Sequence, residues 1–494
     1  MPEAPISLGT QSNPGRDSHI SAARLINCYP EVAGEEGKMQ LPLVAIDSYA
    51  EWVDIGGAGA IRAFLAADDT TLYVAKGSSL YSVDNSKAVT GLGSIAGTGR
   101  VKIVRNQKSP TPDVLVLVTQ GPNSGAGNLY LYNGSTVSSI ADFESGASFI
   151  NGATVSSLSM LNGYAIAGTD AGEFFVSGYQ DASSWQSLDF ETAEKHPDPI
   201  NASETRAGEL VLFGTNSTEF YQVVANVDFP FERSASAEYG CYAPGSVCKV
   251  ASGEGEATSD TLMWAASNAD GSYAGVAVMN GYGRRLISNQ DLDRKIEGET
   301  SKNAITAMAW TRRGHAFYAI SGTSWTYTFD LRTGRWHERQ SSGLSYYEPK
   351  VACQFGTTKL LGSGSSSVIY AIDDTIATTI ASQAKLSFSD DGGHNYSTPR
   401  AKTAGGSTNL TQRFKWNRLG TSKEDGKVLK VEITNAFMAD GVGTSMTIIP
   451  PAVHAWPKRV KFHNVRLDLV PGTSLNSRAK AVTGLSANTD LVGG

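Results

Sequence analysis

The residue types that carry enzyme chemistry occur in this chain without the spacings that active sites require. The sequence contains no Gly-x-Ser-x-Gly nucleophile turn, no His-Glu-x-x-His zinc motif and no Gly-x-x-x-x-Gly-Lys-Ser/Thr phosphate loop. Its seven histidines never fall at metal-ligand spacing. Asp189, Glu191 and Glu194 are close in sequence, but neighbouring acids in loops usually face water. We therefore predict no catalytic residue, no metal, no cofactor and no enzyme activity.

The sharpest local motif is the segment Ser389-Asp-Asp-Gly-Gly-His-Asn-Tyr396, which matches Ser-x-Asp-x-Gly-x-x-aromatic. It resembles the Asp-box hairpin turn of sialidase-like propellers. Asp391 can accept hydrogen bonds from the turn backbone, and Gly393 can adopt positive φ. We therefore expect a structural turn built by Ser389, Asp391, Gly393 and Tyr396. A sialidase would also need an arginine cluster and a nucleophilic Tyr–Glu pair, which the sequence does not identify.

Basic and aromatic residues alternate over Arg413-Phe-Lys-Trp-Asn-Arg-Leu-Gly420. One interpretation is a subunit or nucleic-acid contact, with Arg413, Trp416 and Arg418 as candidate interface residues. The other, which the sequence alone favours, is a strand with one solvated face.

The segment Gly97-Thr-Gly-Arg100 has a faint likeness to a phosphate-binding loop. It lacks the Lys-Ser/Thr pair, and no helix is expected to follow it. The favoured interpretation is therefore an ordinary turn.

Charge and hydropathy exclude some classes of protein. The formal net charge of −7 and the pI near 5.6 argue against a general basic surface that grips nucleic acid. No apolar stretch approaches the ~20 residues that span a bilayer, so no membrane insertion is predicted. The first residues lack the basic start and apolar run of a secretory signal, which predicts folding without export.

Repeated strand patterns organise most of the 494 residues. In the clearest unit, Gly314–Ser341, alternation places Trp325, Tyr327 and Phe329 on one face of a strand. Comparable units begin at Leu72, Leu115, Leu161, Leu210, Leu262, Ala316 and Lys359. A period of ~40–50 residues built from antiparallel strands is typical of a β-propeller with four strands to a blade.

We therefore predict an all-β fold with a β-propeller of about seven blades, within a range of six to eight; a stack of β-sandwiches is the alternative. We expect the aromatic residues of the Gly314 unit to pack between blades. We expect Arg332, Arg335, His337 and Arg339 at its rim. The predicted division is an N-terminal arm or capping segment (1–60), the propeller (61–380), a separate C-terminal β domain (381–475) and a flexible tail (476–494). Gln290–Thr300 is a short helix candidate.

The order of several short motifs is similar to that in the packaged-DNA stabilisation, or tail hub (nozzle), proteins of short-tailed bacteriophages. The resemblance covers roughly residues 95–420 and fades after Gly420, which leaves the role of the C-terminal region open. The motifs are Ala96–Val101, Ser156–Ala165, Trp185 with Ala193–Ile200, Val211–Tyr221, Tyr239–Ala243, the unit at Gly314, Ser389–Tyr396 and Arg413–Gly420.

This resemblance implies a non-enzymatic virion component of a short phage tail, assembled in the host cytoplasm. The protein would form a homo-oligomer, expected to be a hexamer, as a ring below the portal and the tail adaptor protein. The ring would close the DNA channel, retain the packaged genome, guide its ejection and carry tail needle or tailspike (fibre) proteins. Double-stranded DNA would pass through the lumen without sequence-specific binding, and the acidic charge agrees with DNA that slides.

Two further functions are compatible with the sequence. The Asp-box-like turn and exposed aromatic residues favour a carbohydrate-binding or sialidase-like propeller. A propeller that serves as a general interaction scaffold of the host cell is the third hypothesis.

Overall fold

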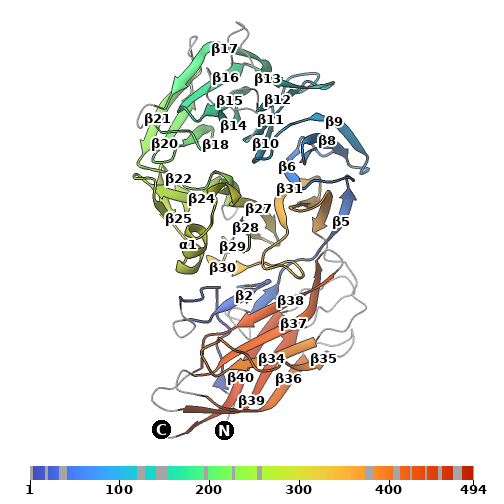
Figure 1. Ribbon diagram of the computed structural model, residues 1–494, viewed down its shortest axis with the longest axis vertical. Helices are drawn as coiled ribbons and strands as arrows, with labels where there is room; N and C mark the ends of the chain where they lie inside the picture. The colour runs from blue at the N-terminus through green and yellow to red at the C-terminus, as the bar shows by residue number, and fades with distance from the viewer. Residues whose placement is uncertain are drawn as a thin grey trace.

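The computed structural model consists of two β bodies, a propeller and a smaller β-sandwich, stacked along the long axis of the molecule (Figure 1). The predicted all-β propeller fold with an additional C-terminal β region is confirmed. The structure describes residues 4–16, 21–32, 42–119, 128–140, 154–193, 198–224, 229–252, 259–372, 383–403, 412–422, 426–439, 442–453, 459–470 and 481–492.

In these described residues the propeller has seven blades. Each blade is an antiparallel sheet of four strands, except that both β22 and β23 pair with β24 in the fifth. The first four blades are β6–β9 (Ile61–Ala66, Thr71–Lys76, Ser79–Asp84, Val89–Ser94), β10–β13 (Val101–Arg105, Val114–Val118, Leu129–Tyr132, Val137–Ile140), β14–β17 (Val155–Leu161, Tyr164–Thr169, Glu173–Gly178, Asp181–Thr192) and β18–β21 (Ala202–Arg206, Glu209–Phe213, Thr218–Val223, Phe231–Ala237).

The last three blades carry the additional helical segments and the closing strand. They are β22–β26 (Tyr239–Cys241, Cys248–Ser252, Ser259–Asn268, Tyr273–Asn280, Gly283–Leu286), β27–β30 (Thr306–Arg312, His315–Ser321, Thr326–Asp330, Arg335–Glu338) and β31–β33 (Pro349–Phe355, Thr358–Ser363, Val368–Ile372) with β5 (Tyr49–Asp54). Helix α1 (Gln290–Glu297) follows the fifth blade and confirms the predicted short helix. Its N-cap, Asn289, accepts a hydrogen bond from the backbone of Leu292 at 3.0 Å.

Alternation along the strands explains how the blades pack. Every residue of β11, with the sequence VLVLV, is buried, because a neighbouring blade covers each face of the sheet. Leu115 and Leu117 pack against the third blade, whereas Val114, Val116 and Val118 pack against the first. Each blade thus supplies half of two apolar layers.

The aromatic residues of the Gly314 unit lie between blades, as predicted. Trp325, Tyr327 and Phe329 belong to one apolar cluster with Met263 of the fifth blade and Leu292 of α1. Burial raises the pKa of the Tyr327 phenol, and its hydroxyl donates a hydrogen bond to Asp291 of α1.

The propeller closes through a strand from the start of the chain. β5 pairs antiparallel with β33, with Tyr49 opposite Ile372 and Asp54 opposite Val368. The expectation of an N-terminal arm over residues 1–60 was therefore wrong, since this segment supplies strands to both bodies. These strands are two to six residues long and carry no periodic pattern of their own, so only their partners reveal them.

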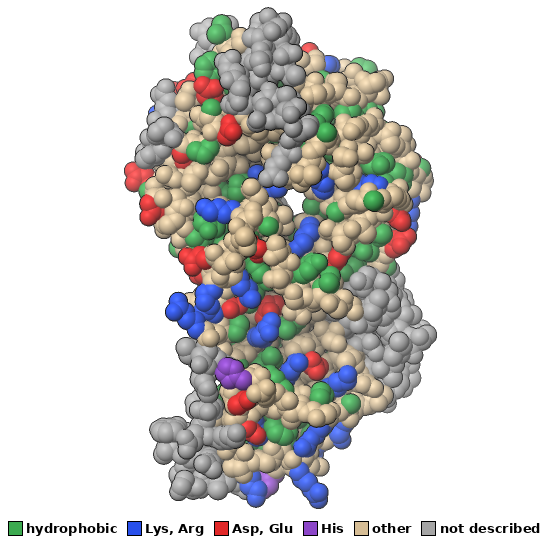
Figure 2. All heavy atoms as spheres, viewed as in Figure 1, with side chains coloured by type: hydrophobic (Ala, Val, Ile, Leu, Met, Phe, Trp, Pro, Cys, Tyr) green, Lys and Arg blue, Asp and Glu red, His purple; other side chains and the backbone are tan. Residues whose placement is uncertain are grey.

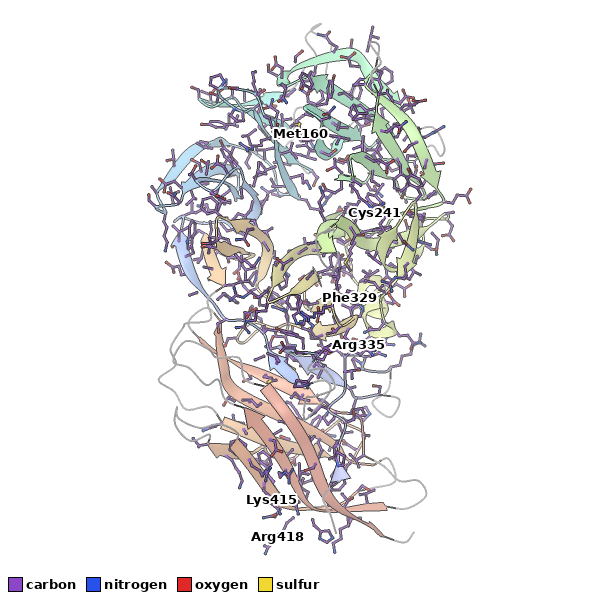
Figure 3. All side chains as sticks on the ribbon, turned by 180° about the vertical axis from the view of Figure 1, so that it is seen from behind. Met160, Cys241, Phe329, Arg335, Lys415 and Arg418 are labelled. Carbon is purple, nitrogen blue, oxygen red and sulfur yellow. The ribbon has the colours of Figure 1, made fainter. Side chains whose placement is uncertain are left out.

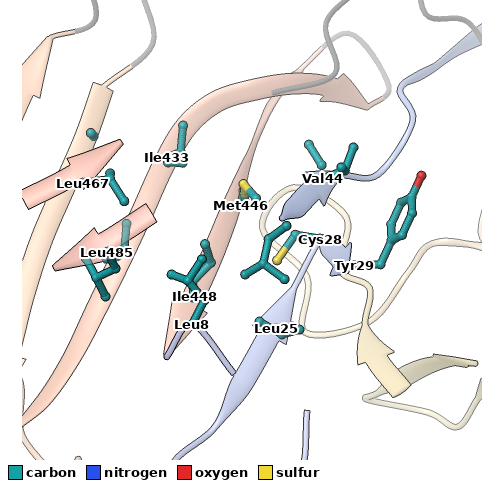
Figure 4. Close-up of a cluster of buried hydrophobic side chains, with 14 of the residues drawn as sticks. Leu8, Leu25, Cys28, Tyr29, Val44, Ile433, Met446, Ile448, Leu467 and Leu485 are labelled. Carbon is teal, nitrogen blue, oxygen red and sulfur yellow. The ribbon is translucent and has the colours of Figure 1, made fainter. Parts of the chain in front are cut away.

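The sandwich is built from both ends of the chain. One sheet has the order β3-β4-β40-β39-β36, with β1 also paired to β40, and the other has the order β2-β38-β37-β34-β35. Their strands are β1 (Ala4–Pro5), β2 (Arg24–Ile26), β3 (Cys28–Pro30), β4 (Leu43–Ala45), β34 (Gln383–Ser389), β35 (Arg400–Thr403), β36 (Gln412–Thr421), β37 (Val428–Ala439), β38 (Val442–Ile449), β39 (Arg459–Val470) and β40 (Ala481–Val492). Side chains from both ends of the chain meet in its core (Figure 4).

β40 corrects the expected flexible tail over residues 476–494. This strand pairs with β39 from Ala481 to Val492, and its Leu485 and Ala487 are buried in the sandwich core. The strand is rich in small and polar residues, so its alternation is weak in the sequence. The domain boundary expected at residues 380 and 381 lies outside the described residues.

Two N-terminal strands join the sandwich to the propeller. β2 pairs in parallel with β30 through Ile26 and Glu338, and β5 pairs in parallel with β37 through Tyr49 and Ala439. One sheet therefore continues from the sixth blade through the sandwich to the seventh. Arg24 strengthens this joint, because its Nε donates to Glu338 Oε1 at 2.9 Å.

Tyr49 is a sensitive position for the joint. Its side chain is buried, its ring lies 5.7 Å from the Tyr347 ring and 4.8 Å from the Tyr370 ring, and its hydroxyl is 3.0 Å from Ser341 Oγ. We expect Tyr49→Ala to lower the free energy of unfolding by about 3–5 kcal/mol, measured by chemical denaturation, because it leaves a cavity. The control Tyr179→Ala, at a side chain that is 63% exposed, should cost less than about 1 kcal/mol. Equal stability of Tyr49→Ala and wild type would contradict the assigned role of β5.

Candidate functional site

The Asp-box-like turn lies in the sandwich, between β34 and β35. Asp391 accepts hydrogen bonds from the Ser389 hydroxyl at 2.5 Å and from the Asn395 backbone at 2.9 Å. The Gly393 amide donates to Ser389 Oγ at 2.8 Å, with φ at 100°. The Tyr396 ring packs on the apolar cluster that contains Val428. These contacts hold the turn together, and its place outside the propeller gives a sialidase site no support.

The candidate interface residues on β36 do not share one surface. Trp416 is only 3% exposed and packs in the sandwich core, where its Nε1 donates to the Arg400 carbonyl at 2.8 Å. Trp416 is therefore unsuited to contact a partner. Arg413 and Arg418 are exposed, and Arg413 Nε donates to Asp468 Oδ1 at 2.9 Å. Arg418 lies near the end of the sandwich that is far from the propeller (Figure 3).

The predicted rim of the sixth blade divides in two. Arg332 and Arg335 are exposed, as expected. His337 and Arg339 are buried, because the N-terminal strands and the following loop cover them. The Arg339 guanidinium lies 4.7 Å from the Trp310 ring, and the His337 ring lies 5.7 Å from the Tyr29 ring. The expectation for these two residues was wrong, since the strand pattern shows nothing of the joint that covers them.

A cavity of about 780 Å³ lies at the axis of the propeller. Residues from one strand of every blade line it, namely β6, β10, β14, β18, β23, β27 and β31, and Figure 2 shows its opening with Lys and Arg side chains beside it. The charged residues that line it in the described part of the chain are five bases and one acid: Arg62, Arg100, Lys102, Lys249, Lys350 and Glu204. The centre of this acidic protein is thus basic.

Glu204 binds two of these bases. Lys102 Nζ reaches Glu204 Oε2 at 2.6 Å, across the third blade, and Lys249 Nζ lies 3.8 Å from Glu204 Oε1. Burial alone would lower the pKa of Lys102, but the Glu204 charge and hydrogen bond outweigh it and raise that pKa. One carboxylate thus serves two ammonium groups.

The two arginines have no carboxylate partner among the residues that the structure describes. Arg62 Nη1 donates to the carbonyls of Gly77 and Gly97 at 2.6 and 2.9 Å, and its Nη2 donates to the carbonyl of Gly99. Arg100 Nε is buried without a hydrogen-bond partner in the described part of the chain. Burial lowers the pKa of both guanidinium groups.

The side chain of Arg100 extends across the axis. A Cβ atom at Gly245, in the short 3-10 helix η2 (Pro244–Ser246) of the fifth blade, would lie 2.9 Å from Arg100 Cδ. The same Cβ atom would lie closer still to the Ile305 carbonyl oxygen, so glycine at position 245 is required first by the backbone before β27 and then by Arg100. The segment Gly97–Arg100, interpreted above as a turn, forms part of the cavity wall and contributes carbonyl groups that face Arg62.

Lys350 differs from the other bases in its surroundings. Burial lowers the pKa of its ammonium group to about 8, against the opposing effect of Glu348 and Glu299. Its Nζ lies 3.4 Å from the Gly322 carbonyl and 4.9 Å from the centre of the Tyr346 ring. The two carboxylates therefore oppose the effect of burial on this pKa without cancelling it.

The sequence analysis missed this cavity, although a signal for it exists. Arg62, Lys102, Lys249 and Lys350 each occupy the second position of an axial strand, namely β6, β10, β23 and β31. Superposition of the repeats in strand register would have found this recurrence. The repeat units compared above began mostly at the second strands, so the axial strands were not aligned.

The described residues contain no group of three or more His, Cys, Asp or Glu side chains that could hold a metal ion. No helix among them is long and apolar enough to cross a membrane. Of the three neighbouring acids, Glu194 lies outside the described residues.

Comparison with known proteins decides the family. The family model described as "Bacteriophage P22 Gp10, beta-propeller" matches residues 51–377. The chain belongs to this family. The match begins within β5 and extends beyond β33, so it spans all seven blades of the described propeller with the closing strand. The resemblance to phage tail hub proteins is confirmed, and the family is one of phage structural proteins.

Comparisons with individual proteins add little to the family match. No curated protein sequence matches the chain. Among solved structures, the computationally designed Ika8 protein is similar with a TM-score of 0.38 and 11% identity, over 71% of this chain and 100% of that one. A chain of the mitotic checkpoint complex is similar with a TM-score of 0.41 and 11% identity, over 66% of this chain and 93% of that one. Likeness at this level carries no argument about function.

The Asp391 turn leads to a prediction about pH. Hydrogen bonds from the Ser389 hydroxyl, then from the Asn395 backbone and side chain, lower the pKa of Asp391 below its ordinary value of 3.8. A lowered pKa stabilises the fold above the unfolded-state value, and that contribution is lost as the pH falls through the folded-state value. Asp391→Ala should therefore lower the urea midpoint at pH 7 and lower it less near pH 3. The control Asp69→Ala, in the exposed turn after β6, should lack this pH-dependent difference; a pH-independent effect of Asp391→Ala would contradict the assignment.

Proposed function

We propose that this protein is a structural component of a short phage tail and assembles into a ring below the portal and its adaptor. In this role it closes the DNA channel, retains the packaged genome and guides its ejection. The observation that carries the proposal is the match of the whole propeller to the P22 Gp10 family. The ring, its six copies and its neighbouring proteins are proposed in addition to the family match.

Backbone pairing between the sandwich and the propeller supports a structural role. Strands β2 and β5 are hydrogen-bonded to both bodies, so the sandwich and propeller are joined by backbone pairing as well as by side chains. The segment before β2 also contacts α1, because Asn289 Nδ2 donates to the Ser12 carbonyl at 2.8 Å and Arg294 donates to the Pro14 carbonyl at 2.9 Å. A joint of this kind suits a protein that transmits force between neighbours in a particle.

An exposed apolar patch on the third blade is our candidate contact with another tail protein. Leu188 is 83% exposed and Phe190 38%. Leu188 and Phe190 lie on β17, the outermost strand of that blade, at the end of the molecule that is far from the sandwich (Figure 1). Soluble monomers rarely expose large apolar patches, so neighbouring exposed apolar side chains often mark a site of association.

The net charge is compatible with a DNA channel. Affinity for duplex DNA depends on cationic contacts to phosphates, and this chain carries a net charge of −7. If the ring presents acidic residues to its lumen, DNA would slide through it.

Electron microscopy of the native particle tests the assembly. We expect six copies of the chain in a ring at the portal-distal face of the adaptor, with density that fits the seven-bladed propeller and the sandwich. Purified chain mixed with the adaptor should give a ring-sized species by size-exclusion chromatography with light scattering. The proposal fails if the chain is absent from purified virions by mass spectrometry and remains monomeric with the adaptor.

A surface variant tests the contact on the third blade. Leu188→Arg should leave the unfolding midpoint of the purified protein unchanged, because the side chain is exposed, and should reduce its incorporation into tails at least tenfold. Leu286→Arg, at a side chain that is 48% exposed on the fifth blade, is the matched control and should be incorporated normally. Normal incorporation of Leu188→Arg would remove the patch from the assembly contacts.

A further inference from the structure

We propose that the axial cavity of the propeller binds a small phosphate-type oxyanion. The site consists of Arg62, Arg100, Lys102 and Lys249, which we call the basic cluster. This inference does not rest on the proposed tail function, since it concerns a single copy of the chain.

The cavity contains more positive than negative charge. Glu204 is the one carboxylate among the lining residues of the described structure, and it is already shared by Lys102 and Lys249. Arg62 reaches carbonyl groups only, and Arg100 Nε has no partner in the described residues. The ammonium group of Lys350 loses its proton more readily than an ordinary lysine, because burial lowers its pKa to about 8, so the four residues of the basic cluster carry the permanent charge. Four cations facing one carboxylate leave three positive charges that a bound anion would offset.

Arg100 without a bound ligand destabilises the folded state. A buried donor without a partner and a charge without a counter-ion both raise the free energy of the folded state. Ordinary packing would favour an apolar side chain at this place against Gly245. An arginine that extends across the axis, with a donor atom still unused, is explained by a ligand that accepts the hydrogen bond.

The donor groups of the basic cluster suit a phosphate-type anion. Guanidinium groups match the oxygen atoms of phosphate with paired donors, whereas ammonium groups act as point charges. The basic cluster contains two of each. The cavity volume of about 780 Å³ lies within the ~300–1,000 Å³ of small-molecule sites. A free phosphate compound and the phosphorylated end of a nucleic-acid strand share this chemistry, and the experiment separates them.

Calorimetry with the full-length protein tests the site. Titration with pyrophosphate at low ionic strength should give saturable binding of one ligand per chain, weakened by added salt because the attraction is electrostatic. Arg100→Gln should weaken binding about tenfold or more, since it removes a charged donor. Arg335→Gln, an exposed arginine on β30 that lies outside the cavity, is the matched control and should bind as wild type does (Figure 3).

The unfolding temperature without ligand shows whether Arg100→Gln is folded, so that lost binding is not caused by unfolding. Because Arg100 Nε has no partner, Arg100→Gln should unfold at the same temperature as wild type or a higher one. Pyrophosphate should raise the unfolding temperature of wild type and Arg335→Gln more than that of Arg100→Gln. A second variant, Glu204→Gln, removes the carboxylate and should tighten pyrophosphate binding.

Competition identifies the source of the phosphate. A short single-stranded oligonucleotide with a 5′-phosphate that displaces pyrophosphate, when the 5′-hydroxyl form does not, would assign the site to a strand end. Failure of both forms to compete would assign it to a free phosphate compound. The proposal is overturned if pyrophosphate and inorganic phosphate both give no saturable binding, or if Arg100→Gln and Arg335→Gln bind equally.

Discussion

The structure depends on closure of the propeller by β5. A blade buries both of its faces only when it has a neighbour on each side, so the first and seventh blades need each other. Their contact includes a strand that lies before the first blade in sequence and pairs with β33. Ser367 in the seventh blade donates a hydrogen bond to Asp54 over a sequence separation of 313 residues. Such a contact has a large loop-closure cost, which the apolar layers between all seven blades must offset.

The same N-terminal segment gives the sandwich its place. β2, β3 and β4 complete the two sandwich sheets, and β2 and β5 extend that pairing to the outer strands of the sixth and seventh blades. The same N-terminal segment therefore both closes the propeller and attaches the sandwich. This arrangement explains why His337 and Arg339, on and beside an outer strand, are buried among aromatic rings. Backbone pairing thus joins the two bodies at this point.

The axial cavity gathers positive charge that its one lining carboxylate in the described residues offsets only in part. Burial lowers the pKa of Arg62 and Arg100 without giving either a carboxylate, while Glu204 holds the two lysines. Packing does not require this, because the layers between the blades are apolar without it. The basic cluster is therefore not needed for packing of the blades, which only hold its residues in place.

The sequence by itself determined the repeat, the strand content, the approximate number of blades and the family, because alternation and recurring turns are local properties. It also determined the Asp391 turn, whose partners lie within six residues. Tertiary structure alone decided the roles of the N-terminal segment and of β40, since short or small-residue strands are defined by the edges that they pair with. It alone buried His337 and Arg339 and gathered the basic cluster, whereas the burial of Trp416 agrees with the one-sided strand that the sequence favoured. The cluster joins residues that are up to 187 positions apart, from Arg62 to Lys249, and only the circular arrangement of the blades makes them neighbours.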